Sequence, residues 1–348
     1  MPINVALVGG GIWAREEHLP AILASKDLVL KAVYSRTNKS ALSIADNVSY
    51  PLDSYTDEDG KGFDVLLERT DIEAVVISLP IKNQIEYIRQ ALLAGKHVLS
   101  EKPVGENMEE AKHLIKWYRT EIKGPSWCVA ENWRFLESYR YAAKHIKSLG
   151  RVLTFYGKQH SLVVPEGKFY QTEWRKNPTH QGGFLLDGGV HYIAGIRQLL
   201  AAQDGNQITQ VSAFTTLLRD YLPPVDTAHA IFKTQSGATG SFQISVGSSS
   251  TADEWTVECE RGWVKINGHG GGSEVTVSKD GQVTTETIQN EKTGVPPEIR
   301  AWGEALVAGR VNKEQEPEAA LADLELIELM LKSGDNQGAT MDCVHQDV

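Results

Sequence analysis

The sequence predicts an α/β protein in which an N-terminal, doubly wound parallel sheet precedes an α+β domain with a large, mostly antiparallel open sheet. Three observations support this fold class. Up to about residue 130, short apolar runs alternate with amphipathic helical patterns. From about residue 151 to residue 287, apolar residues recur at every second position instead. The length of 348 residues is enough for about two domains.

The first half contains five apolar runs that predict buried parallel strands. These runs are Ile3–Val8, Leu28–Tyr34, Ala74–Ser78, His97–Ser100 and Trp127–Ala130. One of the intervening helical patterns places Ile85, Ile88 and Leu92 on a single face. Strands that alternate with helices in this way predict helices on both faces of the sheet.

The second half begins with a predicted helix at about 136–147, which we expect to join two domains at 1–130 and 131–348. Beyond it, runs such as Phe242–Val246 and Trp255–Cys259 alternate apolar with polar residues, so one face of this sheet is covered. We expect Gly268–Gly272 to be a loop. Predicted turns separate the strands at Ser236-Gly237, Asn267-Gly268 and Asp280-Gly281.

Two helices are expected to close the chain. One starts after Pro296-Pro297, and the other runs over Pro317–Leu331, with Gly334 just past its end.

The composition excludes several classes of protein. Thirty-five basic and 45 acidic residues give a net charge of −10, which disfavours nucleic-acid and membrane-surface binding. No apolar run approaches the ~20 residues that span a bilayer, and the first residues read as a strand rather than a signal peptide. The isolated cysteines Cys128, Cys259 and Cys343 form no metal or disulfide motif, which favours a cytoplasmic protein.

A dinucleotide-binding turn is predicted at the end of the first strand, where Gly9-Gly10-Gly11-Ile12-Trp13-Ala14 fits G-x-G-x-x-A. Gly9 permits the tight turn, Gly11 lets the backbone approach a pyrophosphate, and Ala14 permits close packing of the next helix. The N-terminus of that helix favours anions. A purely structural glycine-rich turn is the alternative.

The end of the second strand predicts NADP(H) rather than NAD(H). Ser35, Arg36, Thr37 and Lys39 stand where NAD-selective sites place an acid that binds the ribose 2′-hydroxyl. Arginine and hydroxyl groups instead favour a 2′-phosphate. The alternative is that Arg36 is only a solvated surface residue.

Two segments carry candidate catalytic residues. Lys102 follows a parallel strand at the edge where such sheets bind ligands, and Pro103 holds it extended. If a helix starts near Asp187, then Asp187 and His191 lie one turn apart on one face. Hydride transfer from an alcohol also requires loss of a proton, which a histidine can accept near neutral pH. The alternatives are that Asp187 only caps the helix, or that the pair binds a metal.

At these residues the chain resembles the Gfo/Idh/MocA family of oxidoreductases, and most closely a fungal NADP(H)-dependent branch. The motifs that carry the resemblance are GGGIWA with His18-Leu19-Pro20, AGKHVLSEKP, Ala130–Phe135, and Trp174-Arg175 leading into GGFLLDGGVH. The resemblance implies a Rossmann domain followed by a sheet-containing C-terminal α/β domain. It also implies that Lys102, Asp187 and His191 are catalytic, with a cis peptide between Lys102 and Pro103. The roles of Lys102 and His191 as proton donor and oxygen-polarising cation remain interchangeable.

Further binding residues complete the predicted site, and no metal is expected. The predicted cofactor contacts are Gly9, Gly11, Ile12, Trp13, Ser35, Arg36, Thr37, Lys39, Leu79, Pro80, Asn83, Glu101, Lys102, Asn132, Trp174 and Arg175. The predicted substrate contacts are Lys102, Arg134, Tyr170, Trp174, Asp187 and His191. Gln84 and Ile81 depart from the family's usual His and Asn, so Asn83 and the backbone are expected to replace their contacts. His18, His113 and His145 read as structural or surface residues, and Asp57-Glu58-Asp59 as a solvated loop.

The sequence therefore predicts an NADP(H)-dependent dehydrogenase or reductase that acts on a CH–OH or C=O group of a sugar, polyol or related small carbonyl compound. A non-catalytic, dinucleotide-sensing regulator of the same fold is the alternative. The family resemblance also implies a homodimer that pairs through the open face of the second sheet.

Overall fold

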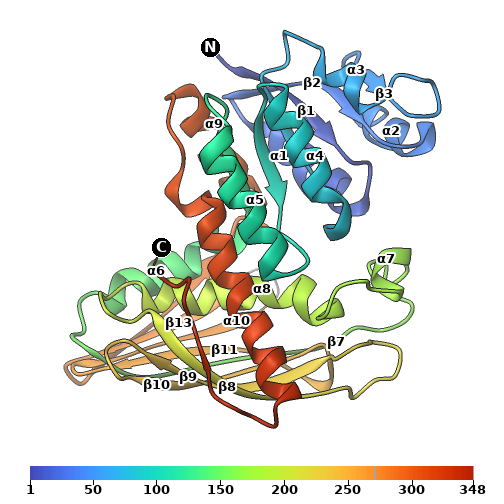
Figure 1. The fold of residues 1–348 in the computed structure, drawn as a ribbon. Coiled ribbons are helices and arrows are strands. Elements are labelled where there is room, and N and C mark those ends of the chain that lie inside the picture. Colours follow the sequence, from blue (N-terminus) through green and yellow to red (C-terminus); the bar gives the residue numbers. More distant parts are fainter. Residues whose placement is uncertain (270–271, 348) are drawn as a thin grey trace. The chain divides into compact units, whose positions relative to one another are not determined.

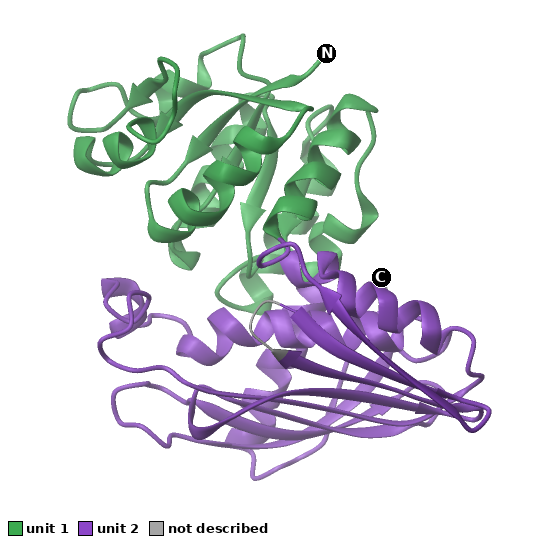
Figure 2. Ribbon diagram, turned by 180° about the vertical axis from the view of Figure 1, so that it is seen from behind, with its two compact units in different colours: residues 1–131, 295–320 green, residues 132–294, 321–348 purple. Residues whose placement is uncertain are grey.

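The computed structural model describes residues 1–269 and 272–347 (Figure 1). The chain forms two compact units, one of residues 1–131 with 295–320 and the other of residues 132–294 with 321–348 (Figure 2). Residues 295–320 belong to the first unit, whereas the sequence predicts all of 131–348 as the second domain. The reason is that Val295, Ile299 and Trp302 of helix α9 are fully buried in the hydrophobic core of that unit. An apolar helix face indicates that the helix packs against a hydrophobic core, but it does not specify which unit provides that core.

The first unit is built on a six-stranded parallel sheet with strand order β3-β2-β1-β4-β5-β6, which confirms the predicted doubly wound fold. Four of its strands are buried on both faces, as near-continuous apolar runs require. The strands are β1 (Ile3–Val8), β2 (Leu28–Tyr34), β3 (Asp53–Tyr55), β4 (Ala74–Ile77), β5 (His97–Glu101) and β6 (Trp127–Ala130).

Strand β3 has no counterpart in the sequence prediction. Its three residues are polar or aromatic and too short to show periodicity, and only their pairing with Ala32–Tyr34 makes them a strand. The helical segments of this unit are η1 (Ala14–His18), α1 (Leu19–Ala24), α2 (Asn38–Ala45), α3 (Phe63–Leu67), α4 (Ile81–Leu93), α5 (Met108–Glu121), α9 (Val295–Val307) and η3 (Lys313–Gln315). Helix α9 starts before the two prolines rather than after them, because proline is tolerated in a first helical turn.

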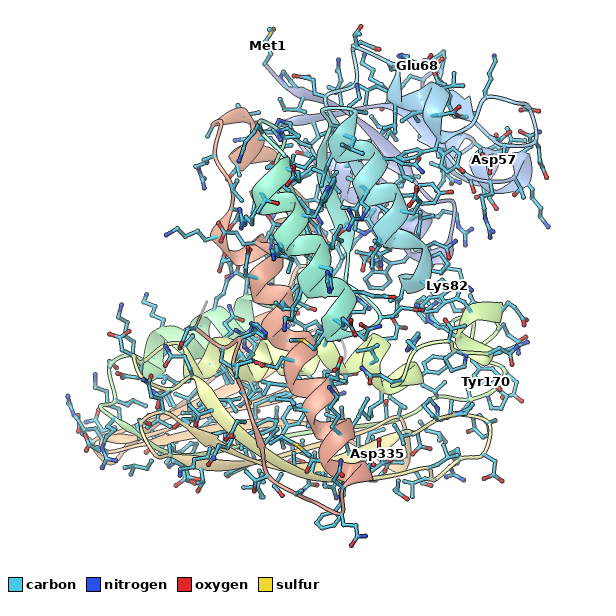
Figure 3. All side chains as sticks on the ribbon, in the orientation of Figure 1. Met1, Asp57, Glu68, Lys82, Tyr170 and Asp335 are labelled. Atoms are coloured by element: carbon cyan, nitrogen blue, oxygen red, sulfur yellow. The ribbon has the colours of Figure 1, made fainter. Side chains whose placement is uncertain are left out.

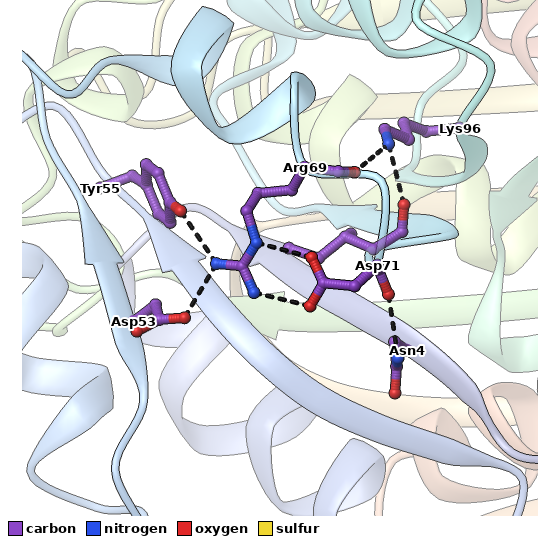
Figure 4. Close-up of polar contacts among 7 residues, drawn as sticks. Asn4, Asp53, Tyr55, Arg69, Asp71 and Lys96 are labelled. Atoms are coloured by element: carbon purple, nitrogen blue, oxygen red, sulfur yellow. Dashed lines mark hydrogen bonds and ion pairs between the residues drawn. The ribbon is translucent and has the colours of Figure 1, made fainter.

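A polar network around Arg69 supports the segment between α3 and β4 (Figure 4). The Arg69 guanidinium binds Asp71 with Nε at 2.6 Å and also contacts Asp53 and the hydroxyl of Tyr55. Lys96, buried within the AGKHVLSEKP motif, donates from Nζ to the backbone carbonyls of Arg69 and Ile72. Lys96 therefore has a structural role at the start of β5, at the opposite end of that strand from Lys102.

The second unit contains a nine-stranded sheet with order β14-β13-β12-β11-β7-β10-β9-β8-β15. All of its pairs are antiparallel except β7–β10, so the predicted mostly antiparallel sheet is confirmed. The strands are β7 (Val152–Leu162), β8 (Ile208–Thr216), β9 (Thr227–Thr234), β10 (Thr239–Ser245), β11 (Gly247–Cys259), β12 (Gly262–His269), β13 (Gly272–Lys279), β14 (Gln282–Gln289) and β15 (Met341–Asp342).

Helices cover one face of this sheet. Helix α8 (Gly183–Leu200) packs on β7, β10 and β11, and α6 (Glu137–Ile146) packs on β12 to β14. Phe242, Trp255 and Val257 point to that covered side and are fully buried. On exposed positions of β7, β8 and β9, by contrast, Tyr156, Phe214 and Ile231 lie open to solvent. The remaining helical segments are η2 (Asn132–Phe135), α7 (Glu173–Lys176) and α10 (Pro317–Asp335).

Two boundaries in this unit differ from the prediction. Asn267 and Gly268 are paired within the β12–β13 ladder rather than forming a turn, and residues 270 and 271 of the predicted loop lie outside the described residues. Helix α10 continues through Gly334, which the sequence analysis placed beyond its end. A Cβ on Gly334 would lie 2.3 Å from Oγ1 of Thr215, so this glycine permits close packing of α10 on β8. The Asp280-Gly281 turn is present as predicted, with both residues at positive φ.

Candidate functional site

The glycine-rich turn after β1 is closed on two sides and open on the third. Gly9 has a φ of 121°, and a Cβ there would lie 2.2 Å from the backbone oxygen of Ser78. A Cβ on Gly10 would lie 2.4 Å from the backbone oxygen of Ser40 in α2. A Cβ on Gly11 would meet no atom within 4 Å among the described residues. The turn is therefore held between the end of β4 and the start of α2, with its open side at Gly11, where a phosphate can approach the backbone.

The helical segment after this turn starts as a π-helix. Within η1 and its junction with α1, the backbone N–H of Leu19 donates to the carbonyl of Ala14, five residues back. Ile12 and Trp13 are half-buried at the turn, and Ala14 is fully buried against the sheet. Single π-turns of this kind often accompany functional sites, because the extra residue re-aims the side chains around it.

The segment after β2 presents cations to solvent. Arg36, Thr37 and Lys39 are exposed, whereas Ser35 is buried. Thr37 also caps helix α2, since its hydroxyl oxygen accepts a hydrogen bond from the backbone N–H of Ser40 at 3.3 Å. Because Gly10 contacts Ser40, the N-terminus of α2 adjoins the glycine-rich turn.

The acidic loop after β3 is exposed, as predicted, and its carboxylates also accept hydrogen bonds from neighbouring residues. The Tyr34 hydroxyl donates to Asp57, marked in Figure 3, at 3.0 Å, and Glu58 accepts a 2.7 Å hydrogen bond from the backbone N–H of Asn38. Asp59 accepts from the Asn38 side chain at 2.9 Å. Burial, Tyr87 and then Asp57 raise the pKa of Tyr34, so its hydroxyl stays protonated as a donor. The three carboxylates thus anchor the end of β2 and the start of α2.

The ends of β4 and β5 carry the other candidate residues of the first unit. Leu79 and Pro80 follow β4, with Pro80 at the N-cap of α4, and Asn83 is half-buried in its first turn. Glu101 ends β5 and Lys102 follows it. The peptide bond between Lys102 and Pro103 is cis, as the resemblance implied. In a parallel sheet the carboxyl ends of β1, β2, β4 and β5 share one edge, so these residues and the glycine-rich turn lie along the same edge.

In the second unit, Asp187 and His191 lie on helix α8. The helix begins at Gly183, four residues before Asp187, so Asp187 is in the helix interior and the N-cap interpretation is wrong. Asp187 and His191 are one turn apart on one face, as predicted. At the start of the helix, Gly183 has a φ of 52°, and a Cβ there would lie 2.4 Å from the Pro223 backbone oxygen.

Asp187 is ion-paired with Arg175, one of the predicted cofactor residues. Nε of Arg175 donates to Oδ2 of Asp187 at 2.8 Å, and both side chains are largely buried. The Arg175 guanidinium also stacks over the ring of Trp174, with its Cζ 4.0 Å from the ring centroid. Trp174, Arg175 and Asp187 therefore form one cluster between α7 and α8.

Trp133, for which the sequence predicts no role, contacts the candidate residue His191. Its ring lies nearly parallel to the His191 imidazole, with an angle of 15° and a centroid distance of 6.2 Å. It also makes an edge contact with Tyr192 at 5.0 Å. Burial, with Asp253 and Asp187, raises the pKa of Tyr192 to about 12, so this hydroxyl is neutral at physiological pH. The one sequence feature that could have pointed to Trp133 is its position in the Ala130–Phe135 motif.

Comparison with known proteins agrees with this architecture. Residues 3–123 match the model of an oxidoreductase family with an NAD-binding Rossmann fold, and residues 139–265 match the GFO/IDH/MocA C-terminal domain. The chain is 40% identical to dehydrogenase FPY6 of Fusarium mangiferae over 97% of this chain and 98% of that protein.

The protein belongs to the Gfo/Idh/MocA oxidoreductase family. It is also 28% identical to a D-xylose 1-dehydrogenase (NADP(+)) of Haloferax volcanii, over 85% of this chain and 88% of that one. An oxidoreductase structure from Thermotoga maritima superimposes with a TM-score of 0.86 at 27% identity, covering 98% of both chains.

In this Gfo/Idh/MocA chain, several predicted ligand-binding residues contact other parts of the protein. Arg134 is buried, and its guanidinium binds Asp323, which also pairs with Arg197 at 2.6 Å. The Asn132 side chain donates to the backbone carbonyl of Thr293. Both side chains thus take part in the internal polar network of the second unit.

Tyr170 (Figure 3) belongs to a small apolar cluster beside the start of α8. Its ring is nearly parallel to that of Phe184, with centroids 6.0 Å apart, and it makes an edge contact with Tyr221. The Tyr221 hydroxyl donates to the backbone carbonyl of Val163 at 3.0 Å. This cluster supports the loop that leads to Trp174 and Arg175.

Residues 1–269 and 272–347 contain no group of three or more His, Cys, Asp and Glu side chains arranged to hold a metal ion. Within the same residues, no helix has the length and apolar character needed to cross a membrane.

Proposed function

We propose that this protein is an NADP(H)-dependent oxidoreductase that acts on a CH–OH or C=O group of a sugar, polyol or related small carbonyl compound. The observation that carries the choice of cofactor is the segment after β2, where Arg36 and Lys39 are exposed and residues 35–39 themselves contain no carboxylate. The carboxylates that reach this segment, Asp57, Glu58 and Asp59, come from the loop after β3 and accept hydrogen bonds from Tyr34 and Asn38. A 2′-phosphate is favoured by such cations, and a carboxylate at this place would repel it. The relative from Haloferax volcanii is named for D-xylose and NADP(+), which supports the same cofactor and substrate class.

The open side of the glycine-rich turn fits a dinucleotide. The adenosine half would bind at Ser35, Arg36, Thr37 and Lys39, and the pyrophosphate at Gly9–Trp13. The nicotinamide half would contact Leu79, Pro80, Asn83, Glu101 and Lys102, which follow β4 and β5. Asn132, Trp174 and Arg175 remain proposed cofactor contacts, although each also has a partner within the protein.

The cofactor, when bound, supplies the acceptor or donor of a hydride. Oxidation of an alcohol carbon also releases the hydroxyl proton, and reduction of a carbonyl takes one up. We assign the proton exchange to His191 and the stabilisation of the substrate oxygen to the Lys102 ammonium group. Asp187 orients His191 or relays the proton, and Trp133 limits the orientations of the imidazole ring. The pH dependence of kcat in variants of Lys102 and of His191 distinguishes this assignment from the one in which the two roles are exchanged.

The test is a kinetic comparison of the wild type with Lys102→Ala and His191→Ala, using NADP⁺ and NAD⁺ with a panel of aldoses, polyols and dicarbonyls. Each variant should lose turnover by orders of magnitude while NADPH still binds. Near-normal turnover in both would refute the catalytic assignment. Tight NADPH binding by a wild type that is inactive on the whole panel would favour a dinucleotide-sensing regulator instead.

We also propose a homodimer in the cytoplasm. The open sheet face exposes Tyr156, Phe214 and Ile231, and apolar side chains on such a face favour a second copy of the chain. The described cysteines are free, and burial raises the pKa of Cys128 to about 12, so it remains a thiol. Sedimentation tests the dimer, and a single species of ~38 kDa would exclude it.

A further inference from the structure

A buried histidine and a buried glutamate connect the helical segment after the glycine-rich turn to the end of β5. Nε2 of His18 lies 2.7 Å from Oε1 of Glu101. The His18 side chain has no exposed surface, and the Glu101 side chain is 10% exposed. The sequence predicts that His18 is a structural or surface residue, and the proposed chemistry does not use it.

The chemistry of the pair determines which atom donates. An ionised carboxylate only accepts hydrogen bonds, so Nε2 carries the hydrogen and donates it to Glu101. Nδ1 of His18 is buried and has no hydrogen-bond partner among the described residues. The imidazole therefore makes one directed polar contact. A buried polar pair is a poor means of stabilisation, because a well-packed apolar pair would serve about equally well.

The pair joins two segments that meet along one edge of the sheet. His18 ends η1, which begins directly after the glycine-rich turn, and Glu101 ends β5 immediately before Lys102. The two residues are 83 positions apart in sequence, so the contact depends on the fold. Any shift of Glu101 would also shift the backbone of Lys102.

Only one oxygen of the Glu101 carboxylate is engaged. In the part of the chain that the structure describes, Oε2 makes no hydrogen bond, while the side chain retains some exposure. Strand β5 lies beyond the point where the strand order reverses between β1 and β4. In doubly wound folds, that half of the sheet faces the nicotinamide riboside of a bound dinucleotide.

We propose that His18 is a positioning residue, which holds Oε1 of Glu101 so that Oε2 accepts a hydrogen bond from the nicotinamide riboside half of the cofactor. The donor on that half is a ribose hydroxyl or the carboxamide N–H. This inference rests on the proposed function, because it requires that a dinucleotide binds at this edge. It assigns the directing contact to a residue that touches neither the cofactor nor the substrate.

The experiment compares two ligands by fluorescence and calorimetric titration. NADPH contains the nicotinamide riboside, whereas 2′,5′-ADP contains only the adenosine half. His18→Leu should weaken NADPH binding about tenfold or more, as expected for a misdirected charge-assisted hydrogen bond, and leave 2′,5′-ADP binding unchanged. His18→Gln, whose amide N–H reaches the Nε2 position, should restore most of the NADPH affinity. His113→Leu, at an exposed position of α5, is the matched control and should change neither affinity.

A second measurement tests whether His18 acts through Glu101. Glu101→Ala should weaken NADPH binding selectively, and in that background His18→Leu should cause no further loss. If His18→Leu fails to fold, His18→Asn takes its place in the same comparison, because the shorter amide side chain does not reach the Nε2 position and so also removes the contact with Glu101.

Two results would overturn the inference. Equal weakening of NADPH and 2′,5′-ADP in His18→Leu would indicate a merely structural contact near the turn. An additional loss in the Glu101→Ala background would show that His18 acts independently of Glu101. If the wild type binds neither ligand, the proposed function itself fails, which is distinct from loss of selectivity in the variants.

Discussion

The Arg175 guanidinium donates to the Asp187 carboxylate at 2.8 Å, so the short helix α7 supplies a cation to the acid that precedes His191 by one turn. The two residues are 12 positions apart, and both are largely buried. Sequence patterns predicted Arg175 as a cofactor contact. Its observed partner adds a second role to the predicted one, because Arg175 also holds the carboxylate of Asp187 on α8.

Arg175→Ala should reduce kcat about tenfold or more, because Asp187 loses a charge-assisted hydrogen bond, and should also raise the dissociation constant of NADPH, because Arg175 is a proposed cofactor contact. Arg175→Lys keeps the charge without the planar guanidinium, so its kcat should fall between those of the wild type and Arg175→Ala. Steady-state kinetics and NADPH titration check this. An unchanged kcat would show that the contact of Arg175 with Asp187 does not affect the reaction, and an unchanged dissociation constant would contradict the proposed cofactor contact.

Arg36→Ala should raise the KM for NADPH about tenfold and leave that for NADH unchanged, because only the former carries a 2′-phosphate. Lys31→Ala is a suitable control, since Lys31 is an exposed cation on β2 itself, before the segment that follows this strand. An equal KM change for both cofactors, or none, would contradict the proposed NADP(H) site.

Two adjacent glycines should respond differently to alanine. Gly11→Ala adds a methyl group to open space at a backbone conformation without positive φ, so Tm should stay the same while NADPH binding weakens at least about tenfold. Gly10→Ala places a Cβ against the Ser40 backbone and should lower Tm. Thermal unfolding and NADPH titration separate the effects. A large loss of Tm in Gly11→Ala would show that its role is structural.

Gly334→Ala should destabilise the protein by about 1–3 kcal/mol, because the added methyl overlaps the Thr215 side chain. Thr215→Ala removes Oγ1 and Cγ2, which are the two closest atoms, so the double variant should recover part of the loss. Chemical denaturation measures both changes. Absence of any recovery would indicate that backbone atoms, rather than Thr215, limit the packing.

His97 should make stability depend on pH. Burial lowers its pKa, and the Ser126 backbone N–H donates to its Nδ1 at 2.9 Å, so the folded state favours the neutral ring. The unfolded state therefore binds a proton at a higher pH than the folded state, and stability is lost as pH falls below about 6.5. His97→Gln should flatten the decline of Tm between about pH 7 and pH 5. The exposed His113→Gln should retain the wild-type slope.

Much of the fold was predictable because its signals are local. Continuous apolar runs indicate strands buried on both faces, as in β1, β2, β4, β5 and β6. Alternation of apolar and polar residues indicates strands buried on one face, as in β10 and β11. The glycine pattern after β1 and the spacing of Asp187 and His191 also act within a few residues of the chain. These features therefore appear in the structure where the sequence predicts them.

Other features depend on which distant segments meet. Strand β3 is a strand only because it pairs with β2, and helix α9 joins the first unit only because Trp302 enters that core. The contacts of His18 with Glu101 and of Trp133 with His191 join residues 83 and 58 positions apart. Residue types and local periodicity determine which side chains are apolar, charged or turn-forming. The tertiary structure alone decides their partners, because a hydrogen bond or a ring contact requires two groups within a few ångströms, whatever their separation along the chain.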